Sequence, residues 1–298
     1  MPVSLFITGA SGFVGRALRE ALGGNHQAIA FGADDWEARL RAAPLRAATI
    51  FHLAARVHHA GDMDEAAFER DNAGKTRSLA EEAVRQGARR VVFVSTIKVN
   101  GEETRGRAFA PGDEPAPAEP YGRSKLSAER ALAQVAGGGG VEWVVVRPPL
   151  VLGPGATGSL RHLMRLVDTP WPLPFAGIEN RRSFVHVADL ARLLITCGEH
   201  PAARNRIFLA AHPVSWSTPT LVAGLRRALG RPPRLFNVPP GAIEGVATIL
   251  GRPDLAQPLT RSLEVDASLA SEVLGWIPAS DLGAALHDVA RAWRTRAS

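Results

Sequence analysis

Short apolar runs alternate with amphipathic segments through the first half of the chain, and a glycine-rich turn joins the first pair. The runs are rich in β-branched residues, whereas the segments between them carry apolar residues at helical spacing. This alternation is typical of a parallel sheet covered by helices on both faces. The expected strands span residues 3–8, 27–31, 48–53, 90–95 and 141–147, and the expected helices span residues 13–22, 34–42, 63–86 and 121–135.

The turn at residues 8–15 reads Thr-Gly-Ala-Ser-Gly-Phe-Val-Gly and lies between the first strand and the first helix. In a dinucleotide-binding fold, Gly9 permits the tight turn, Gly12 lets a pyrophosphate approach the backbone, and Gly15 allows close packing of helix on strand. This position in an α/β alternation predicts dinucleotide binding. The residues expected to contact the cofactor here are Gly9, Ser11, Gly12, Phe13, Val14 and Gly15.

The adenosine end of this predicted site is less regular. A dinucleotide fold usually carries an acidic residue at the end of the second strand, where it hydrogen-bonds the adenosine ribose. Here that position falls near Gly32, and the first carboxylates are Asp34 and Asp35. Either could reach the adenosine, with Asp35 as our candidate, or cap the following helix. The segment 27–48 is also too short for a second full strand, and the choice between NAD and NADP stays open.

After Arg147, repeated prolines break the chain into loops and short elements. A strand at 183–187, a helix at 188–198 and a strand near 206–209 are expected to return the chain to the sheet. From about residue 213 we expect a smaller, mostly helical lobe, with substrate and cofactor meeting between the two parts. The predicted α/β fold is a doubly wound Rossmann domain from residues 1–152 and about 183–212, with a substrate-binding lobe from about 153–182 and 213–298.

The composition excludes several classes of protein. The net charge of +6 comes from scattered basic residues, and aromatic residues make up only 6% of the chain. Nucleic-acid binding is therefore not expected, because it needs a basic track and stacking platforms. The single cysteine, Cys197, excludes an internal disulfide and a cysteine-rich zinc site. No apolar stretch reaches the ~18 residues of a membrane span, and no leader pattern is present. We expect a soluble, cytoplasmic protein.

The only tyrosine of the chain, Tyr121, lies four residues before Lys125, so both side chains share one helix face. The lysine charge is expected to lower the pKa of the phenol, which would let Tyr121 act as a general acid or base near neutral pH. Upstream, a strand ends in Ser95 and Thr96, at the edge where a parallel sheet places catalytic groups. With the glycine turn, these residues predict a catalytic centre beside the dinucleotide.

This ordered set of motifs resembles the extended short-chain dehydrogenase/reductase family, particularly its nucleotide-sugar epimerases and reductases. The resemblance runs along nearly the whole chain. The segments that carry it are Thr8–Gly15, His52–Ala55, Asn72–Thr76, Val94–Gly101, Tyr121–Lys125, Arg147–Pro149, Gly153–Gly155, Arg181–Leu190 and Leu274–Trp276.

The resemblance also implies roles for the matched residues. Thr96 would hydrogen-bond the reacting sugar oxygen, Tyr121 would transfer the proton, and Lys125 would hold the nicotinamide ribose. The further residues implied to line the bound NAD or NADP are Leu53, Ala54, Ala55, Asn72, Ser95 and Pro148. The residues implied to bind a UDP-linked sugar are Lys98, Arg182 and Arg261, the two arginines at its diphosphate. For Arg182 the alternative is a salt bridge to Asp189.

Within this family, the residues after Thr96 bear on the reaction. Dehydration of a 4-keto sugar needs an extra acid and base, and family dehydratases carry Asp-Glu directly after the catalytic Thr. This chain has Ile97 and Lys98 there. A variant dehydratase type has Asp-Lys at these places and lacks the tyrosine, which this chain keeps. A dehydratase is therefore disfavoured.

Reductases and 4-epimerases use the same Thr-Tyr-Lys set. An epimerase retains its cofactor through the cycle, whereas the short segment 27–48 and Gly32 suggest a small adenosine pocket and an exchangeable cofactor. Leu150 also stands where many epimerases carry a substrate-binding Asn. We therefore favour a reductase of UDP-4-keto-6-deoxy-N-acetylhexosamines in polysaccharide or O-antigen synthesis. The alternative is a UDP-glucose or UDP-N-acetylglucosamine 4-epimerase. A non-catalytic cofactor sensor is disfavoured, because such members lose the tyrosine or the lysine.

Two further expectations concern metals and assembly. His52 and the pair His58-His59 form no pattern of metal ligands, so no metal is expected. The helices expected over 63–86 and 121–135 carry apolar residues at helical spacing, and the resemblance implies homodimerisation through them.

Overall fold

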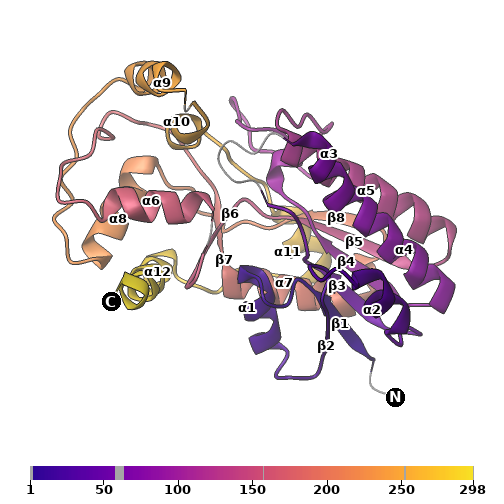
Figure 1. Cartoon of the computed structure of the whole chain (residues 1–298). Helices are drawn as coiled ribbons and strands as arrows, with labels where there is room; N and C mark the ends of the chain where they lie inside the picture. The colour runs from indigo at the N-terminus through magenta and orange to yellow at the C-terminus, as the bar shows by residue number, and fades with distance from the viewer. Residues whose placement is uncertain (1–2, 58–63, 157, 252, 298) are drawn as a thin grey trace.

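The computed structural model describes residues 3–57, 64–156, 158–251 and 253–297. A six-stranded sheet with helices on both faces lies beside a smaller, mostly helical lobe (Figure 1). All neighbouring strands of the sheet are parallel, in the order β2-β1-β3-β4-β5-β8. The doubly wound fold is thus confirmed. The strands are β1 (Leu5–Thr8), β2 (Gln27–Ile29), β3 (Thr49–His52), β4 (Arg90–Val94), β5 (Glu142–Arg147) and β8 (Arg206–Leu209).

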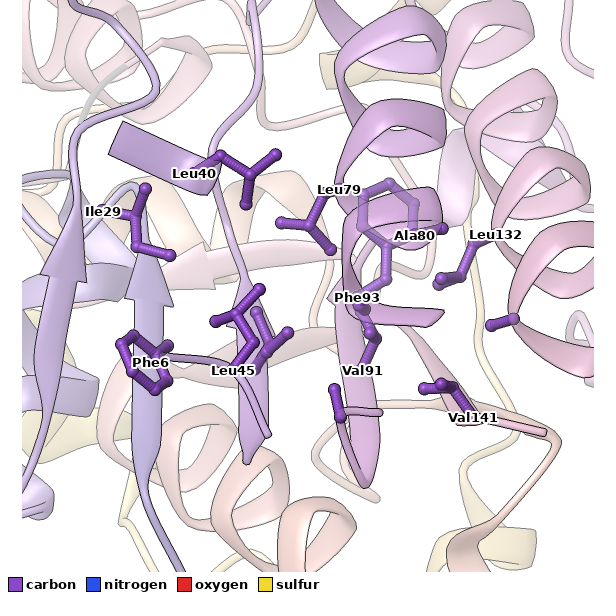
Figure 2. Packing of buried hydrophobic residues seen from close by; sticks show 14 of the residues in the cluster. Phe6, Ile29, Leu40, Leu45, Leu79, Ala80, Val91, Phe93, Leu132 and Val141 are labelled. Carbon is purple, nitrogen blue, oxygen red and sulfur yellow. The ribbon is translucent and has the colours of Figure 1, made fainter. Parts of the chain in front are cut away.

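The central strands are buried because both sheet faces are covered. On one face, side chains of the sheet pack with those of three helices (Figure 2); these are α2 (Trp36–Ala42), α4 (Lys75–Gln86) and α5 (Pro120–Gly138). On the other face they pack with α1 (Phe13–Ala21) and α7 (Val187–Glu199). This two-sided burial explains why β3 and β4 read as continuous apolar runs.

The long helix expected over 63–86 is composite. A short α3 (Glu65–Phe68) leads into a π-helical segment, η1 (Glu69–Gly74), which continues as α4. π-Helical insertions often occur at functional sites. Here the segment carries Asn72, which is buried. Gly87 ends α4 with a left-handed φ of 70°, as helix C-termini commonly do.

The sheet ends at β2, as the short segment 27–48 predicts. Between β2 and β3 the chain forms only α2, so no strand pairs with the outer edge of β2 in the described part of the chain. Gln27 and Ala28 are exposed as a result. The carboxyl ends of the strands form the edge where the cofactor is predicted to bind. At the β2 end of this edge, where the adenosine is expected, fewer elements surround the site than elsewhere.

The strand expected at 183–187 forms but lies elsewhere. β7 (Phe184–His186) pairs with β6 (Leu150–Leu152) in a separate two-stranded parallel sheet, so the expected return to the main sheet at this point is wrong. The reason is that β8 occupies the edge beside β5. Helix α7, which follows β7, does pack on the main sheet as expected.

The lobe has its own apolar core, built from α6 (Ser159–Val167), α8 (Thr218–Ala228) and α12 (Leu282–Ala297). Two further helices, α9 (Pro240–Ile249) and α10 (Pro253–Thr260), pack against each other above it (Figure 1). One part of the segment 213–298 does not join this core. Helix α11 (Ser268–Leu274) packs against β8 and the 3₁₀ turn η3 (Pro201–Ala203), within the Rossmann part.

A buried ion pair fixes α5, the helix that carries Tyr121 and Lys125, to the sheet. Arg147 at the end of β5 donates to both carboxylate oxygens of Glu129 on α5, at 3.0 and 2.5 Å, and to Asn100 Oδ1 at 2.9 Å. The two charged side chains are 2% and 5% exposed. Removing one partner of such a pair would leave an uncompensated buried charge, at a typical cost of about 3–5 kcal/mol. This contact therefore holds α5 in register with the carboxyl edge.

In the ranges that the structure describes, no helix combines the length and the apolar character that a membrane span requires.

Candidate active site

The glycine turn after β1 is shaped so that only glycines fit. Gly9 has a φ of +71°, and a Cβ there would lie 2.7 Å from the amide nitrogen of Ala54. A Cβ on Gly15 would lie 2.2 Å from the carbonyl oxygen of Gly9. Gly12 occupies the N-cap of α1 and has no side chain to cap the helix. The first amides of α1 are therefore left for an anion, which fits the pyrophosphate of a dinucleotide.

The segment after β3 lies beside this turn. The amide of Leu53 donates to the carbonyl of Thr8 at 3.2 Å, and the amide of Ala54 donates to Thr8 Oγ1, also at 3.2 Å. Residues 53–55 are partly exposed, as expected for residues that line a ligand. The structure thus brings together the two backbone segments that the sequence assigns to the cofactor.

Asn72 holds the backbone of Arg56, which continues the segment 53–55 that is predicted to line the cofactor. Its Oδ1 accepts from the amide of Arg56 at 2.8 Å, and its Nδ2 donates to the Arg56 carbonyl at 3.1 Å and to Ser124 Oγ at 2.9 Å. Ser124 Oγ in turn donates to the carbonyl of Tyr121 at 2.9 Å. Asn72 therefore positions the cofactor wall relative to the catalytic helix. Ser124 was not identified from the sequence, although it lies inside the Tyr121–Lys125 motif.

Thr96 and Lys125 lie at the carboxyl end of β4, and Tyr121 lies one turn before Lys125 at the start of α5. Lys125 is buried and donates from Nζ to the carbonyl of Val94 at 2.8 Å. Its ammonium lies 3.9 Å from the ring centre of Phe93. Thr96 caps the 3₁₀ turn η2 (Ile97–Val99), and its Oγ1 accepts from the amide of Lys98 at 3.3 Å. These contacts tie Thr96 and Lys125 to the end of β4, whereas the ring of Tyr121 packs against Phe68, with 6.1 Å between the ring centres.

The expected effect of Lys125 on Tyr121 is wrong for the protein alone. Burial raises the pKa of Tyr121 to about 12, and burial lowers the pKa of Lys125 to about 7, with Glu129 acting in the opposite direction. Desolvation disfavours the charged form of each group. Because Lys125 is itself half neutral near pH 7 and bonded to Val94, it does not pull down the phenol's pKa.

Ser95 and Pro148 frame the site from two neighbouring strands. The amide of Ser95 donates to Val146 at 2.8 Å, and the amide of Ile97 donates to the carbonyl of Pro148 at 3.0 Å. The hydroxyl of Ser95 is buried and has no hydrogen-bond partner among the described residues. An unpaired buried hydroxyl is costly, so a ligand that supplies its partner fits this place.

Lys98 lies in a charged cluster that the sequence did not reveal. Its Nζ is 2.5 Å from Glu119 Oε2 and 3.1 Å from Glu102 Oε2. Burial opposes the charge of Lys98, but the two carboxylates outweigh it and raise its pKa. Burial also raises the pKa of Glu102, whose Oε1 has no hydrogen-bond partner in the described part of the chain.

Arg182 and Arg261 lie next to each other, but their guanidinium groups have different partners. Arg182 Nη1 donates to the carbonyl of Arg261 at 2.9 Å, and burial lowers the pKa of Arg182 to about 10, against the effect of Glu102. The alternative partner of Arg182, Asp189, instead pairs with Arg192. The Arg261 guanidinium is held by Glu244 and Glu103, each at 3.2 Å. A diphosphate at Arg261 would have to compete with these two carboxylates.

Two remaining candidates lie at the edges. Asp35 is exposed and pairs with Arg39 Nε at 2.7 Å, a hydrogen bond that lowers the pKa of the carboxyl. His52 is buried, and its ring bonds Thr8 Oγ1 at 2.6 Å and Thr76 Oγ1 at 3.0 Å. His58 and His59 lie outside the described residues. Within the described ranges, no three His, Cys, Asp or Glu side chains gather as metal ligands do.

The comparison with protein families agrees with this geometry. A model of the NAD dependent epimerase/dehydratase family matches residues 5–211.

The chain belongs to this family.

The resemblance to extended short-chain dehydrogenases and reductases is thereby confirmed, and the cofactor is NAD or NADP.

Curated relatives of this family match most of the chain. A UDP-glucose 4-epimerase of Vibrio cholerae is 35% identical over 316 residues, which covers 98% of this chain and 96% of the relative. A UDP-glucose 4-epimerase of Streptomyces lividans is 29% identical, over 76% of this chain and 69% of the relative.

Solved structures show the same fold. RMD from Pseudomonas aeruginosa, complexed with NADPH, superposes with a TM-score of 0.79 at 19% identity, covering 99% of this chain and 100% of that chain. The UDP-glucose 4-epimerase of Thermotoga maritima gives a TM-score of 0.76 at 20% identity, again over 99% and 100%. These likenesses support the fold of both the Rossmann part and the lobe.

The arrangement can carry out proton-coupled hydride chemistry on a sugar carbon. A nicotinamide cofactor, when bound here, would supply or accept the hydride. Tyr121 is protonated near neutral pH because of its raised pKa, so it can donate a proton to an oxygen that gains negative charge. Thr96 offers a hydroxyl to the same oxygen. Lys125 donates to the Val94 carbonyl, and in its predicted role its remaining N–H donors would hold the nicotinamide ribose.

Replacing Tyr121 by Phe should abolish turnover while cofactor binding persists. In its predicted role the phenol hydroxyl donates the proton, and loss of general acid catalysis should cost ~10²-fold or more in kcat. Steady-state kinetics and calorimetric titration with the cofactor measure the two effects separately. Activity within about threefold of wild type would show that the proton comes from elsewhere.

The buried Lys125 should also make stability depend on pH. Its pKa is about 7 in the folded protein and 10.5 in the unfolded chain, so between these values the unfolded state binds more protons. The free energy of unfolding should therefore rise with pH, and this residue should contribute about 2 kcal/mol between pH 7 and 9. Urea denaturation of wild type and Lys125→Met measures the difference.

Lys98→Met is the matched control for that experiment. Because its neighbours raise the pKa of Lys98, this residue keeps its proton in both states up to pH 9 and should leave the slope unchanged. Equal slopes for wild type and Lys125→Met would contradict the shifted pKa.

Proposed function

We propose that this protein is an NAD(P)H-dependent reductase of the C4 ketone of a UDP-linked 4-keto-6-deoxy-N-acetylhexosamine, acting in polysaccharide synthesis. The observation that carries the proposal is the structure at the end of the sheet where the adenosine of the cofactor is expected. The sheet ends at β2, and Gly32 stands where a ribose-binding acid is expected. A small adenosine pocket favours release of the oxidised cofactor after each cycle, which a reductase requires.

The catalytic residues are compatible with reduction. A hydride adds to C4 of the ketone, the C4–O double bond becomes a single bond, and the alkoxide takes the proton of Tyr121. This direction starts from a protonated phenol, which is the form that burial favours. Ile97 and Lys98 after Thr96 supply no carboxylate for dehydration.

The second candidate is a UDP-hexose 4-epimerase. It is favoured by one observation, the 35% identity to the Vibrio cholerae UDP-glucose 4-epimerase over nearly the whole of both chains. An epimerase would keep its NAD bound, because the hydride removed from C4 must return to the same sugar.

One set of assays separates the two candidates. We expect the purified protein to lack tightly bound cofactor and to oxidise added NADPH or NADH when the dehydratase-generated UDP-4-keto sugar is supplied. UDP-glucose and UDP-N-acetylglucosamine, incubated without reductant, should stay unchanged. Epimer formation from either sugar without consumption of reduced cofactor would replace the reductase by the epimerase.

A measurement of UDP binding by a variant of Arg182 complements these assays. Arg182 is partly buried, interacts electrostatically with Glu102 and lacks a carboxylate within salt-bridge distance among the described residues, so we propose that it binds the diphosphate. Arg182→Ala should weaken UDP binding by about tenfold or more, the usual scale for a charge-assisted hydrogen bond. Arg181→Ala, which removes an exposed arginine paired with Glu264, is the control. Equal UDP binding by wild type and Arg182→Ala would contradict the role.

We also propose that two copies associate through α4 and α5. The outer side of η1, α4 and α5 forms a groove of about 410 Å³ that carries Arg70, Arg77, Arg130 and one acid, Glu69. None of the exposed large apolar residues lies on the described parts of α4 or α5. In a symmetric contact the arginines of the two copies would face one another, so their repulsion would oppose association at low salt and would be screened as salt is raised.

Sedimentation velocity at micromolar concentration should accordingly detect a dimer whose share rises as salt is raised. Arg130→Glu, which places a carboxylate opposite the partner's arginines, should shift the protein toward dimer at low salt, whereas Arg204→Glu, a change of an exposed arginine outside the groove, should not. A wild-type protein that is monomeric at every salt concentration would contradict the dimer.

A further inference from the structure

The end of β2 lacks the group that normally recognises an unphosphorylated ribose. A carboxylate at this point accepts hydrogen bonds from the ribose 2′-hydroxyl in NAD-binding folds, whereas a nearby cation accommodates the 2′-phosphate of NADP. Gly32 has no side chain. Of the two carboxylates that follow it, Asp34 is exposed, and Asp35 is 56% exposed and bound to Arg39.

A lysine from another helix reaches the same point. Lys75 is the first residue of α4, directly after the π-helical segment, and its Nζ donates to the carbonyl of Phe31 at 3.1 Å. Phe31 immediately precedes Gly32. The ammonium also lies 5.4 Å from the ring centre of Trp36, at the start of α2. The Lys75 side chain is 23% exposed, so it is held in place and still accessible.

The ammonium of Lys75 has capacity for a ligand. Of its three N–H donors, the contacts within the described ranges use one at hydrogen-bond distance, the bond to Phe31. The carboxylate of Asp71 lies farther away, at 3.7 Å. Two donors can therefore turn toward a group at Gly32.

Positive charges outnumber negative ones around Lys75. One carboxylate, Asp71, lies within 4 Å of three cations, at 3.5 Å from Arg56, 3.5 Å from Arg70 and 3.7 Å from Lys75, and it offsets only part of their charge. At the glycine turn, Arg16 adds a further positive charge where its Nη1 donates to the carbonyl of Ser11 at 2.7 Å. A phosphate monoester carries close to two negative charges near pH 7 and accepts several charge-assisted hydrogen bonds, whereas a neutral hydroxyl gains little from an ammonium.

We propose that Lys75 binds the 2′-phosphate of NADP, so that NADPH is the cofactor of this enzyme. The proposal refines the cofactor of the reductase proposed above. Its test is a binding measurement without any sugar, so the two proposals can fail separately.

Isothermal titration calorimetry of the full chain with four ligands tests the assignment. The ligands are NADPH, NADH, and the fragments 2′-phospho-ADP-ribose and ADP-ribose, which lack the nicotinamide. Wild type should bind each phosphorylated ligand at least about tenfold more tightly than its partner without the phosphate. Lys75→Gln should remove this preference and leave the affinity for NADH and ADP-ribose within about twofold of wild type.

Charge-matched variants separate recognition from net charge and from folding. Lys75→Arg keeps a cation and should keep the preference, whereas Lys75→Glu should reverse it in favour of NADH. Arg41→Gln removes an exposed cation that pairs with Glu37 on α2 and should change nothing. Melting temperatures identify any variant that is destabilised, in which case the comparison rests on wild type and Lys75→Arg. Wild-type binding that is equal or tighter for NADH would overturn the proposal, as would equal weakening of all four ligands by Lys75→Gln.

Discussion

A buried chain of hydrogen bonds connects the cofactor turn to the catalytic helix, and the geometry of the site depends on it. Its direction can be assigned from the donors. Thr76 Oγ1 donates to the carbonyl of Asn72 at 2.6 Å, so it must accept from Nε2–H of His52. Nδ1 of His52 then accepts from the hydroxyl of Thr8. Burial lowers the pKa of His52 to about 3, so this neutral tautomer persists across the physiological range. From Asn72 the chain continues through Ser124 to the backbone of Tyr121.

The parts of the molecule that follow local rules could be predicted from the sequence. All six strands of the sheet lie within expected apolar runs. The glycine turn leaves no room for a side chain at Gly9 or Gly15, as its spacing implies. The missing strand beyond β2 followed from segment length alone. In contrast, β7 pairs with β6 and not with the main sheet, because the choice between two edges depends on which strand reaches the free edge of β5. Spacing along the chain carries no information on that competition.

The electrostatics of the site were the least predictable part. The Tyr121–Lys125 spacing suggested that a charge would activate the phenol, but it could not show that both groups are desolvated together. Glu102 and Glu119 reach Lys98 from a loop and from the residue before α5. Glu103 and Glu244 likewise reach Arg261 from two separate segments. Such pairings arise from tertiary contacts, and only the folded chain reveals them.

The three-residue edge strand β2 has a consequence for how the protein is connected to metabolism. Because no described strand lies beyond β2, little backbone would surround the adenosine half of a cofactor bound at this edge. Under the proposed reduction, the cofactor leaves after each cycle, and every turnover draws electrons from the shared cellular pool. The output of such an enzyme follows the ratio of reduced to oxidised nicotinamide, and falls when that ratio falls. A cofactor retained in a closed pocket would have isolated the same chemistry from the redox state of the cell.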